Sequence, residues 1–167
     1  MKEILPEELN ENPFKLIEKD WMLITAEKDN RTNMMTASWG DLGIMWGKKV
    51  ATIYIRRSRF TKTFIDAGNT FSLCVLGEEY RNQLAYCGKA SGRNEDKVSK
   101  SGLHVEHADG VPYFSESRLV LICKKLYTQE MNAESFTEAG KDIPSKTYAD
   151  DDWHTMYIAE IEKILIK

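Results

Sequence analysis

The sequence predicts a mainly β protein, a closed β-barrel with peripheral helices. Six or more stretches are typical of strands, the strongest being Val50–Ile55, which reads Val-Ala-Thr-Ile-Tyr-Ile, and the apolar run within Ser117–Thr128. The few expected helices do not alternate regularly with the strands, which argues against a doubly wound sheet. No internal repeat, low-complexity tract or linker interrupts the 167 residues, so we expect a single domain over residues 1–167.

The expected elements follow one another along the whole chain. An acidic arm over residues 1–19 leads to a short turn or helix at Pro13–Glu18. The expected strands are Trp21–Ala26, Asn33–Trp39, Val50–Ile55, Thr70–Leu76, Leu103–Glu106, Ser117–Thr128 and Trp153–Ile166. The expected helices are Arg59–Ala67, Glu78–Ala90 and Ala133–Ala139, and Ser91–Gly102 is expected to be a polar loop.

The stretch Gly40–Gly47 carries three glycines and is expected to form a bend. Its apolar side chains are Leu42, Ile44, Met45 and Trp46. An exposed apolar bend suits a partner surface. A bend that folds over the protein's own core is an equally good interpretation of the same residues.

Composition excludes several classes of function. Apolar residues make up 42% of the chain and charged residues 29%, as in an ordinary soluble globular protein. The net charge of −3, without strong basic blocks, argues against nucleic acid as the main partner. Cys74, Cys87 and Cys123 lack a Cys-x-x-Cys spacing, so neither a disulfide framework nor a metal site is expected. Without an apolar signal segment or a run approaching about 20 apolar residues, we expect no membrane span and a cytoplasmic location.

The junction after Val50–Ile55 gathers positive charges and hydroxyl groups. Its polar residues are Arg56, Arg57, Ser58, Arg59, Thr61 and Lys62. Ser58 is a good N-cap for the helix that follows. A helix start leaves free backbone N–H groups, and neighbouring guanidinium and hydroxyl groups add directed donors, as a phosphate needs. Taken alone, the pattern favours a solvated basic helix start, and the strand before it shifts the balance toward an anion site.

Four motifs, which span most of the chain in order, resemble the flavin reductase–flavoredoxin family. The pattern Asn-x-Met-Thr-x-Ser-Trp stands at Asn33–Trp39, and Arg-x-Ser-Arg-x-Thr stands at Arg56–Thr61. The pattern Cys-Gly-x-x-Ser-Gly-Arg-x-x-Asp-Lys stands at Cys87–Lys97, and the weaker His-x-x-Tyr-Ile-x-Glu-Ile stands at His154–Ile161. The resemblance implies an FMN-binding split barrel of Greek-key type, which forms a homodimer with flavin at the subunit interface.

The resemblance also implies which residues hold the FMN phosphate. They are Arg56, Ser58, Arg59 and Thr61. The turn departs from the family pattern twice, with Arg57 where proline is common and Phe60 where tyrosine is common. It keeps its charged donors and loses the tyrosine hydroxyl.

By the same resemblance, the backbone of Thr36, Ala37 and Ser38 lines the isoalloxazine edge, with Asn33 and Trp39 beside it. Backbone N–H groups there would favour the extra electron density of reduced flavin. For Trp39 a plain alternative is a core position next to small residues.

Several residues outside these two motifs keep more than one interpretation. Lys97 lies in the polar loop, where a solvated lysine is the default, although the resemblance implies that it approaches the flavin. A contact with the phosphate is a third alternative. Ser91 and Arg93 shape the same loop or reach the phosphate. His154 is not expected to act as an acid or base, and Cys87 lacks an adjacent basic residue or second cysteine that would make it a redox thiol.

Three functions agree with these observations. The first is an FMN-binding oxidoreductase of flavin reductase type, which moves electrons from NADH or NADPH through FMN to a flavin or protein acceptor. No catalytic side chain is assigned, since flavin chemistry belongs to the cofactor, and without a Gly-x-Gly-x-x-Gly the nicotinamide would be a diffusible substrate. The second is a flavoredoxin-like electron carrier that exchanges electrons with a redox partner protein. The third is a barrel that binds another phosphorylated ligand.

Overall fold

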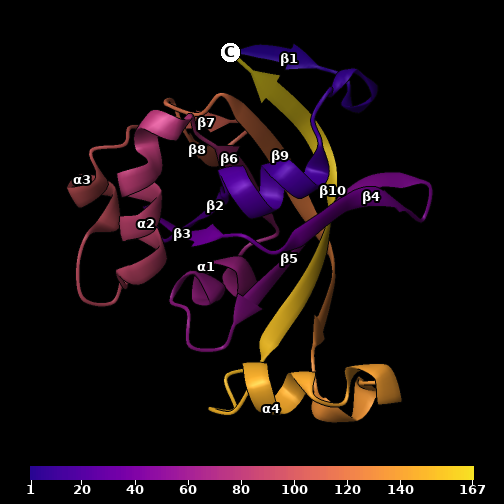
Figure 1. Ribbon diagram of the computed structural model, residues 1–167. Coiled ribbons are helices and arrows are strands. Elements are labelled where there is room, and N and C mark those ends of the chain that lie inside the picture. Colours follow the sequence, from indigo (N-terminus) through magenta and orange to yellow (C-terminus); the bar gives the residue numbers. More distant parts are fainter.

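The computed structural model describes residues 1–167 as a strongly bent sheet, with α2 and α3 on one side of it and α4 at the lower end (Figure 1). The strands are β1 (Lys2–Ile4), β2 (Met22–Lys28), β3 (Arg31–Ala37), β4 (Gly40–Met45), β5 (Lys48–Arg56), β6 (Thr70–Val75), β7 (Val105–Ala108), β8 (Val111–Phe114), β9 (Leu119–Glu130) and β10 (His154–Ile166). The α-helices are α1 (Thr61–Ala67), α2 (Arg81–Lys89), α3 (Lys97–Ser101) and α4 (Ile143–Thr147). Lys15–Asp20 is a π-helix, and the 3-10 turns are Pro6–Glu8, Glu78–Tyr80, Ala133–Ser135 and Glu138–Gly140. None of the helices has the length and apolar character needed to cross a membrane.

Eight strands form one antiparallel sheet in the order β3-β2-β6-β9-β10-β5-β4, with β1 added along β10. The long strand β10 pairs with β9 on one edge and with β5 and β1 on the other. β3 and β4 are the two end strands and are not paired with each other. The prediction of a mainly β fold with peripheral helices is therefore confirmed, although strand pairing leaves the barrel open between β3 and β4.

Alternation along the strands divides the core into two layers. Leu23 and Ile24 are neighbours in β2 and are both fully buried, but they belong to different apolar clusters because successive side chains point to opposite faces. Ile24 packs inside the bent sheet with Phe71 and Tyr157. Leu23 packs with Leu84 of α2 and with residues of the β7–β8 hairpin. This second layer fixes α2 against the outer face of β2 and β3.

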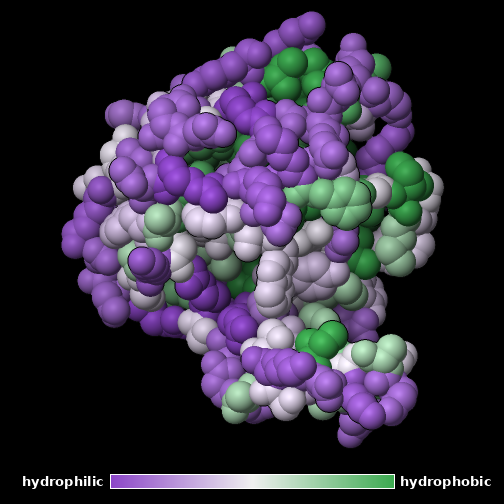
Figure 2. All heavy atoms as spheres, viewed as in Figure 1, coloured by the Kyte–Doolittle hydropathy of each residue, from purple (hydrophilic) through white to green (hydrophobic).

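The stretch expected to be a bend is the edge strand β4. Gly40 to Met45 pair with Lys48 to Ile53 of β5, and Trp46 and Gly47, both with positive φ, form the connecting hairpin turn. Ile44 and Trp46 are 70% and 55% exposed. The interpretation that this stretch folds over its own core is therefore wrong for the hairpin tip, whose apolar surface lies at the right of Figure 2.

Other expected boundaries change for local reasons. The polar loop 91–102 contains α3, because Asp96 caps it by accepting from Ser99 N at 3.1 Å and Gly102 ends it with positive φ. Ser58 is not an N-cap: α1 begins at Thr61, and the Ser58 hydroxyl donates to Asp152 instead. The elements β1, β8 and α4 are not among the predicted ones, because they are short and lack a long periodic pattern.

Candidate functional site

A hollow of about 290 Å³, here called the strand cavity, runs along the end of β3. Its lining residues are Met35, Thr36, Ala37, Ser38, Trp39, Tyr54, Arg56, Arg59, Gly88 and His154. β3 is an end strand of the sheet, so the backbone groups on its outer edge have no strand partner. The strand cavity thus combines a free backbone edge, two aromatic side chains and two arginines.

A second, smaller hollow of about 120 Å³ lies between the turn before α1 and the loop after α2. The residues that line this loop cavity are Ser58, Arg59, Phe60, Thr61, Lys89, Ala90, Ser91, Gly92 and Lys97. Arg59 lines both hollows. Its guanidinium makes no hydrogen bond within the chain, and burial lowers its pKa while the charge of Asp152 raises it. A half-buried arginine without a bonded partner is well suited to receive an anion.

The five predicted residues of β3 and its end lie in different surroundings. Thr36, Ala37, Ser38 and Trp39 all line the strand cavity. Trp39 is 51% exposed, with its ring centroid 5.0 Å from that of His154, which rules out the core interpretation. Asn33 lines neither cavity and is buried.

The buried amide of Asn33 has a structural contact instead. Its Nδ2 donates to Thr61 Oγ1 at 2.9 Å and so joins β3 to the first residue of α1. A Cβ on Gly92 would come within 2.3 Å of Asn33 Oδ1, so this close approach of the loop requires glycine. A direct contact of Asn33 with a ligand stays a prediction.

The predicted phosphate turn is held by the segment before β10. Arg56 donates to the backbone oxygens of Asp152 and Thr147 at 2.9 and 3.1 Å. Ser58 N and Oγ both bond to the Asp152 carboxylate. Arg93 donates to Ser58 O at 2.7 Å, so it shapes the turn. Among the predicted phosphate donors, Arg59 is therefore the one charged side chain that makes no hydrogen bond within the chain, while the Thr61 hydroxyl accepts from Asn33.

Lys97 is buried, with 3% of its surface exposed, so the default of a solvated surface lysine is wrong. Its Nζ donates to Met34 O at 2.6 Å and to Cys87 O at 2.7 Å. Burial lowers the pKa of Lys97 to about 8, and the charge of Arg59 adds to this. The third Nζ hydrogen remains for a ligand in the loop cavity. Cys87 itself is buried, which raises its pKa and keeps the thiol protonated.

His154 and Tyr148 form a pair beside the strand cavity. Tyr148 Oη lies 2.9 Å from His154 Nδ1, and the Tyr148 ring stacks on Trp153 with centroids 4.2 Å apart. Burial lowers the pKa of His154 to about 4, and the Arg56 charge adds to the effect. His154 is therefore neutral at pH 7, and with Nδ1 accepting from tyrosine its Nε2 carries the proton.

A third hollow of about 470 Å³, the aromatic cavity, opens beside the strand cavity. Its lining residues are Trp39, Tyr54, Met131, Phe136, Ile143, Thr147, Tyr148 and His154, of which Trp39, Tyr54 and His154 are shared with the strand cavity. No lining side chain carries a full charge at neutral pH. The segment 131–153, at the bottom of Figure 1, supplies most of its walls.

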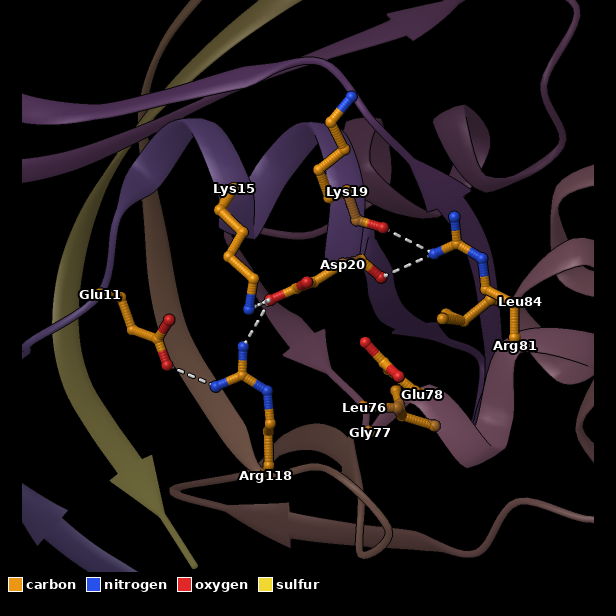
Figure 3. Close-up of a pocket in the computed structure, with 10 residues that line it drawn as sticks. All are labelled: Glu11, Lys15, Lys19, Asp20, Leu76, Gly77, Glu78, Arg81, Leu84 and Arg118. Atoms are coloured by element: carbon orange, nitrogen blue, oxygen red, sulfur yellow. Dashed lines mark hydrogen bonds and ion pairs between the residues drawn. The ribbon is translucent and has the colours of Figure 1, made fainter.

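The largest of these hollows, about 710 Å³, contains none of the predicted site residues. Figure 3 shows its charged side chains turned toward one another: Arg118 bonds to Glu11 and Asp20, and Arg81 donates to the backbone oxygens of Lys19 and Asp20. These contacts tie the π-helix to α2 and to Arg118, the residue before β9. Since Arg118 and Arg81 already have partners within the chain, these contacts are better explained as structural than as a ligand site.

Sequence reasoning missed Tyr54, Gly88, Lys89 and Asp152 as parts of the site and left His154 without a role. His154 and Gly88 had a signal, because His154 begins the fourth motif and Gly88 belongs to the third. Tyr54, Lys89 and Asp152 reach the site through tertiary contacts that no local sequence pattern predicts.

The comparisons with known proteins agree with this fold. The family model described as "Flavin reductase like domain" matches residues 15–167, so the chain belongs to the flavin reductase-like family. An uncharacterised Escherichia coli (strain K12) protein, YddH, is 27% identical over 146 residues, which cover 84% of this chain and 77% of YddH.

Solved structures give the same architecture. Flavoredoxin from Methanosarcina acetivorans superposes with a TM-score of 0.71 at 18% identity, over 89% of this chain and 68% of the flavoredoxin. The NADH:FAD oxidoreductase SgcE6 of Streptomyces globisporus C-1027 gives a TM-score of 0.66 at 14% identity, over 89% of this chain and 74% of SgcE6. The sequence-based assignment to the flavin reductase–flavoredoxin family and its split-barrel fold is confirmed.

Proposed function

We propose that this protein binds FMN and transfers electrons from NADH or NADPH through it to a free flavin or a protein acceptor. The isoalloxazine ring would lie in the strand cavity against Thr36–Trp39, and the phosphate would lie in the loop cavity. Bound FMN supplies the hydride and electron chemistry, while the chain binds and orients it.

The observation that supports this proposal most strongly is the position of Arg59. It is a half-buried cation without a bonded partner, and it lines both the cavity with the free strand edge and the cavity with Lys89 and Lys97. One ligand with a flat polar ring and a phosphate on a short tether satisfies both cavities at once. A phosphate bonded to arginine and lysine gains charge-assisted hydrogen bonds of about 1.5–3 kcal/mol each.

The aromatic cavity supports access by an electron donor or acceptor. It meets the strand cavity at Trp39 and His154, so a planar molecule there would face the exposed side of a ring held along β3. The neutral His154 offers an N–H donor at this boundary without placing a charge in an apolar wall. A nicotinamide or a second flavin fits this description.

The exposed tip of the β4–β5 hairpin is also compatible with a second candidate, a flavoredoxin-like carrier that exchanges electrons with a redox partner protein. Ile44, Met45 and Trp46 are 70%, 41% and 55% exposed on an end strand of the sheet. We propose that a second copy of this chain covers this tip in a homodimer. A carrier and a flavin reductase would share this surface, so the hairpin alone does not choose between them.

A spectrum and one anaerobic mixing experiment test the proposal. Purified protein titrated with FMN is expected to take up flavin and show its visible absorption. Mixing the loaded protein anaerobically with NADH or NADPH should bleach that absorption. Flavin uptake without bleaching by either nucleotide would favour the carrier, and no flavin uptake would contradict both functions and favour another phosphorylated ligand.

A further inference from the structure

The turn that would hold the flavin phosphate already holds a carboxylate of the chain itself. Asp152 Oδ1 accepts from Ser58 N at 2.9 Å, and Asp152 Oδ2 accepts from Ser58 Oγ at 2.6 Å. A phosphate at this turn would use the same two donors in the same manner. The Asp152 side chain is only 17% exposed, so this is an enclosed contact rather than a surface encounter.

The backbone fixes this carboxylate in place. Arg56 donates to Asp152 O at 2.9 Å, and Arg57 N donates to Trp153 O at 3.0 Å. The next residue, His154, pairs directly with Arg56 in the β5–β10 ladder. The pairing of β5 with β10 therefore places Asp152 next to Ser58, so this contact is a consequence of the fold.

The Asp152 charge also acts on Arg59. Its effect on the Arg59 pKa opposes that of burial, so the carboxylate partly compensates the buried cation. A phosphate bound to Arg59 would bring a second anion into the range of Asp152. At an effective dielectric near 20, one charge pair some 8 Å apart changes binding by about 30-fold before screening, and salt screening reduces this effect.

We propose that Asp152 is a specificity-determining residue, an internal counter-anion that occupies the Ser58 side of the turn and weakens the hold on the flavin phosphate. The inference rests on the proposed FMN function and deepens it. Such a site gains less from the phosphate than Arg59 and the lysines alone would give, so its preference for FMN over riboflavin is narrower than without Asp152. Flavin then exchanges readily with solution, which suits a reductase that passes flavin on.

The test compares FMN and riboflavin affinity in wild type and in Asp152→Asn, from quenching of flavin fluorescence at pH 7 and low salt. The amide keeps an acceptor oxygen for Ser58 N and removes the charge. We expect FMN to bind about tenfold tighter and riboflavin to change less than twofold. Asp150→Asn is the matched control, because Asp150 lies in the same segment but is 71% exposed, and it should leave both affinities within twofold.

Other outcomes overturn the inference. If Asp152→Asn weakens both flavins, Asp152 supports the turn, and if the FMN-to-riboflavin ratio is unchanged, it has no role in selectivity. Should the asparagine variant fail to melt cooperatively, Asp152→Ser gives the same comparison with the same expected direction. Wild type that binds neither flavin would refute the proposed function, whereas wild type that binds FMN with an unchanged ratio in the variants would refute this inference alone.

Discussion

The phenolic oxygen of Tyr148 lies 2.9 Å from Nδ1 of His154, at the boundary of the strand and aromatic cavities. Burial and the nearby Arg56 charge lower the pKa of the imidazole to about 4, so it is neutral at pH 7. The two residues are only six positions apart in the sequence but belong to different elements. Tyr148 directly follows α4, and His154 begins β10.

Acidification is expected to destabilise the protein partly through His154. The unfolded chain binds a proton near pH 6.5 and the folded chain near pH 4, so stability is lost as the pH falls through this window. The shift corresponds to about 3 kcal/mol in full, and the loss is complete below pH 4. Urea unfolding of His154→Gln between pH 7 and 4 should show a shallower loss than wild type. Equal slopes would contradict the burial of a neutral imidazole.

Arg59→Ala should weaken FMN far more than riboflavin, because only FMN carries the phosphate. Loss of a charge-assisted contact predicts an effect of about 1.5–3 kcal/mol for FMN. Arg57→Ala is the matched control, since Arg57 is exposed and paired with Glu130 at 2.6 Å. Fluorescence titration with both flavins measures the effect, and equal weakening of the two would remove Arg59 from the phosphate site.

Lys97→Met should weaken oxidised and reduced FMN together and leave the midpoint potential nearly unchanged. Lys97 lines the loop cavity with Arg59 and Thr61, on the side assigned to the phosphate. Its pKa of about 8 adds a second signature: wild-type FMN affinity should fall as the pH rises through 8, and the variant should lack this step. A lowered potential in the variant would instead indicate that the ammonium reaches the flavin ring.

A homodimer is expected by light scattering at micromolar concentration. Trp46→Lys places a charge on the exposed tip of the β4–β5 hairpin and should shift the mass toward one chain. Leu5→Lys, at another exposed apolar position, serves as the control and should leave the mass unchanged. A wild-type protein that stays monomeric with flavin bound would refute the dimer.

The sequence predicted the structure correctly where a residue's environment depends on its neighbours in the chain. The predicted strand Val50–Ile55 lies within β5, and Arg56 is the last residue of that strand. The motif at Asn33–Trp39 and the motif at Arg56–Thr61 meet in the strand cavity. Membership of the family followed from four such short motifs.

The contacts that modify the site are not local. Ser58 and Asp152 are 94 residues apart, and the sequence around either residue does not predict contact with the other. The burial of Lys97 depends on carbonyl groups of β3 and α2, which come together only through the second core layer. Local propensity does not describe contacts between residues distant in sequence. It therefore predicted a solvated Lys97 and a Ser58 that caps a helix.

The place of β10 in the sheet has a consequence for how the chain assembles during synthesis. β2, β3, β6 and β9 can pair with one another as they leave the ribosome, and β4 can pair with β5. Only β10 joins the two groups, because it lies between β9 and β5. Until it emerges, the nascent chain carries two unfinished sheets, each with an uncovered edge open to wrong pairing. Residues 154–166 therefore control when the nascent chain stops being vulnerable to aggregation.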